Sequence, residues 1–102
     1  MADESVTTWI KRVQSDPWAA QQIWQRYVGQ LVALARARLR RVHTVADEDD
    51  VVVIAFEKFL RAAKAGRFPK LDDREDLWQI LVLLTDRVAV DLIRRHLAVK
   101  RG

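Results

Sequence analysis

The pattern of hydrophobic and polar positions predicts four α-helices separated by short breaks. The clearest one starts with the acidic run of residues 47–50 and ends near residues 65–66. Over residues 51–63 its apolar residues recur at spacings of three and four and would form one wide face. Val53 and Ile54 fall outside this face, because at about 100° per residue they lie among the charged positions Asp50, Glu57 and Arg61. We therefore expect Val53 and Ile54 to be covered by a second helix or to contact a partner molecule.

Two helices are predicted before this segment. The first is short, with a cap at Ser5 or Thr7, apolar residues at helical spacing and an end near Ser15. The second begins at Asp16-Pro17, where an N-cap residue is followed by a proline suited to the first helical position. Its apolar face continues to about residue 41.

The last helix is predicted to begin at a capping pair formed by Asp72 and Glu75, after a loop over residues 66–71. Its apolar residues spread around nearly the whole circumference, which is typical of a helix packed by several neighbours. We therefore expect this helix to be central. The predicted fold class is all-α, a compact bundle of four helices, one short and three long, in a single domain over residues 1–102.

Composition limits the class of protein. The chain has 102 residues and no cysteine, so it can bury a core of its own but has no disulfide and no thiolate chemistry. The N-terminus lacks the pattern of a signal peptide, and no apolar run approaches the ~20 residues of a membrane span. We therefore expect a cytoplasmic protein with no membrane partner. The net charge of +4 is compatible with a polyanionic partner.

No catalytic group is assembled in the sequence, so we do not expect an enzyme. His43 and His96 have no carboxylate or hydroxyl partner at a spacing that predicts contact, and there is no glycine-rich phosphate loop. The acidic run of residues 47–50 lacks the glycine and alternating oxygens of a calcium loop, and it suits the N-terminus of a helix. We expect no metal and no cofactor. Four tryptophans lie at or beside apolar helical positions, where core packing is the expected role of most of them.

Basic residues gather in two places. Those at the end of the second helix, Arg36, Arg38, Arg40 and Arg41, suit the C-terminus of a helix and are expected to stay solvated. In the last helix, Arg87, Arg94 and Arg101 are seven residues apart and share one stripe, with Arg95 and Lys100 beside it. Such a stripe can follow phosphates, or its side chains can simply remain in water.

The loop before the last helix adds Arg67, Phe68 and Lys70 to this stripe. Cationic groups beside an aromatic ring are the combination that holds unstacked bases. The residues by themselves are equally compatible with a nucleic-acid interface made by this loop and the last helix and with side chains that only stay solvated.

Several segments in this order resemble region two of bacterial extracytoplasmic-function (ECF) sigma factors. They are residues 47–56, a loop with Gly66 and Phe68, and Ala89-Val90-Asp91-Leu92-Ile93-Arg94-Arg95. Residues 16–39, with Trp24 and Tyr27, are similar to the first conserved helix of the family, so the resemblance covers nearly the whole chain. It implies a helical domain that docks on the clamp helices of the RNA polymerase β′ subunit and captures the melted non-template strand of the promoter minus-ten element.

The resemblance also implies which residues make these contacts. The polymerase-facing residues would be Asp50, Val53, Ile54, Glu57 and Arg61. The promoter contacts would come from the loop with Arg67, Phe68 and Lys70 and from the stripe with Arg87, Arg94, Arg95, Lys100 and Arg101. The second DNA-binding domain of the family has no counterpart in these residues. We therefore expect a domain that ends before the linker and region four.

Two positions depart from the family pattern. Val53-Ile54 stands where a polar Gln-Glu pair is usual, and Asp86-Arg87 stands where an Arg-Asn pair is usual. The first makes the expected polymerase contact more apolar, and the second puts the usual base preference in doubt.

Two other functions stay open. One is a protein-interaction module, occupied by an anti-sigma factor or by a second copy in a weak homodimer, because Val53 and Ile54 would expose an apolar patch. The other is a duplex-binding helix-turn-helix regulator, although the segment 66–72 is longer than the turn of that motif.

Overall fold

A computed structural model describes residues 2–40 and 48–101, and this part of the chain contains four helices and no strand. The helices are α1 (Ala2–Arg12), α2 (Pro17–Leu39), α3 (Glu48–Lys64) and α4 (Arg74–Arg101). Three long helices and one short helix confirm the predicted fold class. α1 begins earlier than the predicted cap at Ser5 or Thr7.

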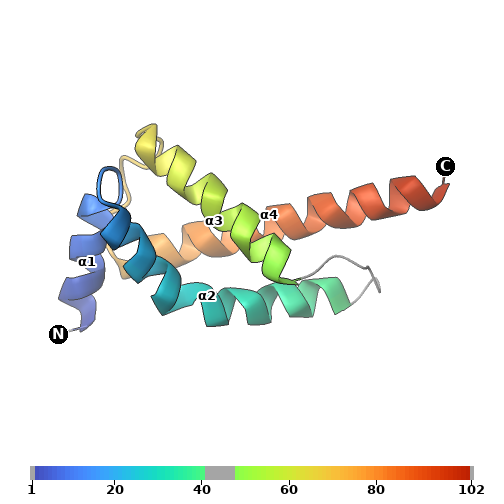
Figure 1. Cartoon of the computed structure of the whole chain (residues 1–102), viewed down its shortest axis with the longest axis horizontal. Coiled ribbons are helices and arrows are strands. Elements are labelled where there is room, and N and C mark those ends of the chain that lie inside the picture. The colour runs from blue at the N-terminus through green and yellow to red at the C-terminus, as the bar shows by residue number, and fades with distance from the viewer. Residues whose placement is uncertain (1, 41–47, 102) are drawn as a thin grey trace.

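The prediction of a central last helix is only partly confirmed, because α2 as well as α4 contacts all three other helices. Figure 1 shows α3 crossing α4. The C-terminal turns of α4 extend past the ends of the other helices. The long dimension of the molecule is 48 Å. A helix of 28 residues alone spans about 42 Å at 1.5 Å per residue, so α4 accounts for most of that length.

Each helix contributes one apolar face to a single core. The largest fully buried apolar side chains are Val6 of α1, Ile23 and Leu31 of α2, Val51, Val52 and Phe59 of α3, and Leu77 and Leu81 of α4. Thr85 is the one buried polar residue among the described residues, and its hydroxyl donates a 2.8 Å hydrogen bond to the Leu81 carbonyl. The core therefore contains no charged group in the described part of the chain.

A row of aromatic rings connects α2 to the loop after α3. Trp24 packs on Phe56 with ring centroids 5.1 Å apart, and Phe56 packs on Phe59 at 5.7 Å. Phe59 then stacks on Phe68 at 5.8 Å with an interplanar angle of 16°. Trp9, Trp24 and Trp78 are partly buried against the core, as expected of most tryptophans, whereas Trp18 is 54% exposed.

The caps explain where α2 and α4 begin. The Asp16 carboxylate accepts a 2.9 Å hydrogen bond from the Trp18 N–H, which confirms the predicted start of α2. The predicted capping pair of α4, Asp72 with Glu75, is wrong by one position. Asp73 accepts from the Asp76 N–H at 2.9 Å, while the Asp76 carboxylate accepts from the Asp72 N–H at 3.3 Å.

Candidate nucleic-acid interface

The loop after α3 starts from a fixed turn at Gly66. Gly66 has a φ of 71°, the Arg67 N–H donates to the Ala62 carbonyl at 3.0 Å, and the Gly66 N–H donates to the Ala63 carbonyl at 3.0 Å. These two bonds form a Schellman motif, which satisfies carbonyls that the end of the helix leaves free. The direction in which the chain leaves α3 is therefore set by the backbone.

Phe68 lies in this loop with one face against the core. Its ring stacks on the buried ring of Phe59, and the Leu71 N–H donates to the Phe68 carbonyl at 3.1 Å, so the loop folds back on itself. The sequence predicted an aromatic ring here for unstacked bases and gave no sign of the Phe59 contact. Phe68 is partly buried, and only the rest of its surface is available to a ligand.

A hollow of about 400 Å³ lies between this loop and the first turns of α4. Residues 67–71 form one side of it, and Asp76, Gln79, Ile80 and Leu83 form the other. Leu83 is 49% exposed although it is a large apolar residue. The hollow therefore combines apolar surface with the exposed cations Arg67 and Lys70 at its rim.

The predicted basic stripe runs along the outward side of α4. Arg87 and Arg94 are exposed and line a shallow depression with Val90, and Arg95 is exposed beside them. Lys100 and Arg101 belong to the last turn of α4, and their side chains lie outside the described part of the structure. The loop residues thus lie against the first turns of α4, and Arg87 lies further along the same helix. Spacing along the chain alone did not establish this arrangement.

The predicted polymerase-facing residues share one side of α3. Asp50, Glu57 and Arg61 are exposed, and Val53 is 43% exposed. Ile54 differs from the expectation, because it is only partly exposed and packs against the core. The exposed apolar patch expected at these two positions is therefore mainly Val53.

The basic cluster at the end of α2 is partly tied to other helices, which corrects the expectation that it only stays solvated. Arg36 Nε lies 3.1 Å from Glu48 Oε1 of α3, and Arg38 Nε lies 2.8 Å from Asp86 Oδ1 of α4. A hydrogen bond from its own backbone N–H, together with Arg36, holds the pKa of Glu48 below its ordinary value. Arg40 is exposed, and Arg41 is outside the described residues.

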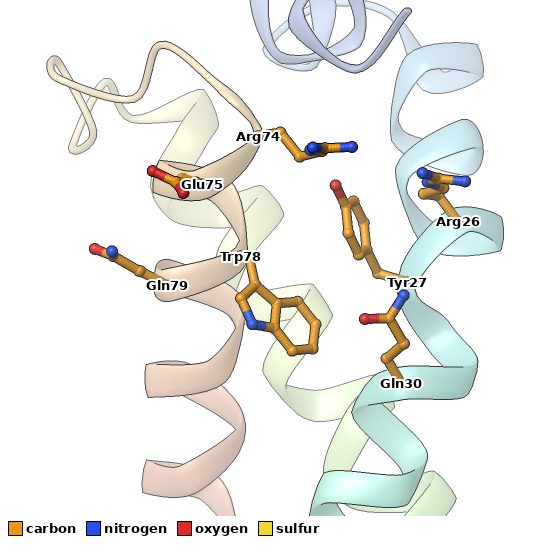
Figure 2. Close-up of a pocket in the computed structure, with 7 residues that line it drawn as sticks. All are labelled: Arg26, Tyr27, Gln30, Arg74, Glu75, Trp78 and Gln79. Carbon is orange, nitrogen blue, oxygen red and sulfur yellow. The ribbon is translucent and has the colours of Figure 1, made fainter. Parts of the chain in front are cut away.

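A second concavity lies between α2 and the first turns of α4. It has a volume of about 390 Å³, and Figure 2 shows the guanidinium groups of Arg26 and Arg74 near the hydroxyl end of Tyr27. The Tyr27 and Trp78 rings pack with centroids 5.9 Å apart and an interplanar angle of 30°. No spacing in the sequence predicted this concavity, because its two sides are about fifty positions apart. The ring pair joins α2 to α4.

Two features tested across the described residues are negative. No group of three or more His, Cys, Asp or Glu side chains in residues 2–40 and 48–101 is arranged to hold a metal ion. None of the helices described is long and apolar enough to cross a membrane.

Comparison with known protein families shows which family this chain belongs to. The sequence model described as ECF sigma factor matches residues 3–102, nearly the whole chain. The chain belongs to the ECF sigma factor family. This membership implies the role of a transcription initiation factor, and the family is not a known class of enzymes. Searches of curated proteins and of solved structures found no match.

One departure from the ECF pattern has a structural explanation. Asp86 stands where the family usually has the first residue of an Arg-Asn pair, and here its carboxylate is held by Arg38 of α2. Arg87 is exposed on the outward side of α4. Of these two residues, Asp86 therefore makes a contact within the protein, and Arg87 remains an exposed cation.

Proposed function

We propose that this domain docks on the β′ clamp helices of RNA polymerase through α3 and holds the melted non-template strand of the minus-ten element between the 66–71 loop and α4. The observation that carries this proposal is the hollow beside Phe68 and Leu83, because it joins apolar surface to Arg67 and Lys70. An unstacked base offers a flat apolar face, and the phosphates next to it require cations. Arg87, Arg94, Arg95, Lys100 and Arg101 continue the basic track along α4.

The polymerase contact would use Asp50, Val53, Ile54, Glu57 and Arg61. Exposed charges around a single exposed apolar side chain suit a docking face that binds a charged partner helix. The family membership supports polymerase core as the partner. The β′ subunit and the residue assignments are part of the proposal.

The test compares single-stranded with duplex minus-ten DNA, using the domain assembled with polymerase core at low salt. Single strands should bind more tightly, with log affinity falling against log salt at a slope of roughly −3 if about four phosphates are neutralised. Leu83→Asn should weaken strand binding, because Leu83 lines the hollow and is exposed enough to change without disturbing the core. Trp18→Asn changes another exposed apolar residue, one that does not line the hollow, and is the matched control.

Tighter binding to duplex DNA would contradict strand capture and favour a duplex-reading regulator. The connection over residues 65–73 already counts against a helix-turn-helix, whose turn has three or four residues. Equal losses for Leu83→Asn and Trp18→Asn would remove the hollow from the interface.

A second function, docking of a protein such as an anti-sigma factor, is favoured by one observation. Leu83, Val90 and Leu97 are exposed, lie seven residues apart on α4 and have no role in binding phosphates. A partner helix would bury these side chains, and in its absence a second copy could do so in a weak dimer. Sedimentation of the isolated chain at rising concentration tests the dimer, and a strictly monomeric profile would contradict it.

A further inference from the structure

A third cavity separates the α3 surface from the α4 stripe. It has a volume of about 370 Å³ and lies between the second half of α3, the start of the loop and the middle of α4. Four basic side chains line it: Lys58 and Arg61 from α3, Arg67 from the loop, and Arg87 from α4. The cavity is therefore a meeting point of cations from three segments of the chain.

None of these four cations is neutralised within the described residues. The ion pairs of residues 2–40 and 48–101 do not include them, and neither do the side-chain hydrogen bonds. One carboxylate, that of Asp91, also lines the cavity, so the cations outnumber it by four to one. An exposed cation is often only solvated, but convergence of four around one cavity favours an anion.

The shape and chemistry of the cavity suit a phosphate group. Leu84 and the buried Val88 give it an apolar floor, which lowers the access of water to one side of a bound group. Arginine donates pairs of hydrogen bonds in a fork, and lysine supplies a compact charge, so the four together can reach oxygens that point in different directions. A phosphate group has such oxygens and carries enough charge to bind several cations at once.

We propose that this cavity is a phosphate-binding site in which Lys58 and Arg61 act together with Arg67 and Arg87. Lys58 gains a binding role that the sequence did not suggest, and Arg61 becomes a residue shared between the α3 surface and the nucleic-acid side. The phosphate comes either from the backbone of a bound strand, in which case the inference rests on the proposed function, or from a free phosphate compound.

The first experiment uses inorganic tripolyphosphate, which tests the site without any promoter. The 102-residue chain is titrated at low salt while backbone amide shifts are followed by NMR. We expect the shifts to centre on Lys58, Arg61, Arg67 and Arg87. Lys58→Gln and Arg61→Gln should each weaken binding by about three- to tenfold, because each removes a charge-assisted contact.

Matched controls are available on α3 and on α2. Lys64→Gln removes an exposed lysine of α3 and Arg26→Gln an exposed arginine of α2, and neither side chain lines the cavity. Both controls should stay within twofold of the unchanged protein. Equal losses in the controls, or shifts spread evenly over the basic residues, would show general attraction of anions and overturn the proposal.

The second experiment repeats the four variants with a short single-stranded oligonucleotide. A loss confined to Lys58→Gln and Arg61→Gln identifies a backbone phosphate as the ligand. If tripolyphosphate binding depends on these two residues and strand binding does not, the site stands and its ligand is a free phosphate compound. The tripolyphosphate experiment therefore tests the phosphate site by itself, even if the domain proves not to capture a single strand.

Discussion

Arg38 and Asp86 form a two-pronged ion pair that fastens the end of α2 to the middle of α4. Arg38 Nε lies 2.8 Å from Asp86 Oδ1, and Arg38 Nη2 lies 3.2 Å from Asp86 Oδ2. The two residues are far apart in sequence, so the pair closes a large part of the chain. Asp86, which belongs to one of the two departures from the family pattern, therefore contributes to holding the fold together.

Removing this ion pair should cost a modest amount of stability. The side chains are 46% and 31% exposed, so water screens the charges, and Asp86→Asn should lower the free energy of unfolding by about 0.5–1 kcal/mol. Urea denaturation of Asp86→Asn, Arg38→Gln and the double variant would measure the coupling. Asp91→Asn, which changes an exposed aspartate of α4 that forms none of the ion pairs among the described residues, is the control. Additive losses would contradict the pairing.

Glu48 should make stability depend on pH in the acidic range. Its pKa in the folded protein is below the ordinary value of 4.5, so its charge contributes stability that is fully present above about pH 4.5 and is lost as the pH falls through the folded pKa. The difference in melting temperature between the unchanged protein and Glu48→Gln should therefore shrink below pH 4.5. A difference that stays constant from pH 7 to pH 3 would be inconsistent with this pKa shift.

Val53 and Ile54 should respond differently to the same change. Val53→Lys should alter the free energy of unfolding by no more than about 0.5 kcal/mol, since Val53 is exposed. Ile54→Lys should cost about 1–3 kcal/mol, because Ile54 packs against the core and a lysine there loses that contact. Thermal melts measure both, and binding of Val53→Lys to a β′ clamp-helix fragment should be weaker. Equal stability of the two variants would mean that Ile54 is not packed.

Phe68→Ala should affect stability and strand binding together. Loss of the stack on Phe59 should lower the free energy of unfolding by about 1–3 kcal/mol, less than for a fully buried phenylalanine. Strand affinity should fall without a change in its salt dependence, because stacking releases no counterions. Both are measured by denaturation and by binding at several salt concentrations. A changed salt slope would show that Phe68→Ala disturbs the phosphate contacts as well.

Replacing Gly66 or Gly29 by alanine should change the stability of the protein in opposite directions. Gly66→Ala should destabilise the protein by about 1 kcal/mol, because Gly66 has a φ of 71° that an alanine adopts at a cost. Gly29→Ala should stabilise it by about 0.5–1 kcal/mol, since Gly29 lies inside α2 and a Cβ there meets nothing within 4 Å. Melting temperatures measure both. A loss at Gly29 would indicate a contact that its open surroundings do not contain.

The sequence predicted the helices well because their signals are local. Proline after Asp16 and the spacing of the apolar residues in α3 depend on neighbours within a few positions, and they placed α2 and α3 closely. The start of α4 was displaced because Asp72 and Asp73 are both good caps, and spacing alone does not choose between them. The order of motifs also led to the ECF sigma factor family, which the family match confirms.

The candidate site was harder to predict because its contacts join distant segments. Helical periodicity put Ile54 on the charged side of α3, but it could not decide between cover by the rest of the protein and contact with a partner, whereas in the structure Ile54 packs against the core. The ion pair of Arg38 with Asp86 depends on how the helices cross, and so does the placement of Lys58 and Arg87 around one cavity. No local pattern contains that information.

The projection of α4 beyond the other helices has a consequence for how its two ends move. Around Leu77 and Leu81 the helix is buried, so its amides should exchange with solvent only when the whole domain unfolds. Around Arg94 and Leu97 the side chains are exposed, and the backbone bonds there depend mainly on the helix itself. These turns open at a much smaller free energy. A partner that binds Arg94 therefore also stabilises these turns against opening, and part of the binding free energy is offset by the loss of conformational entropy.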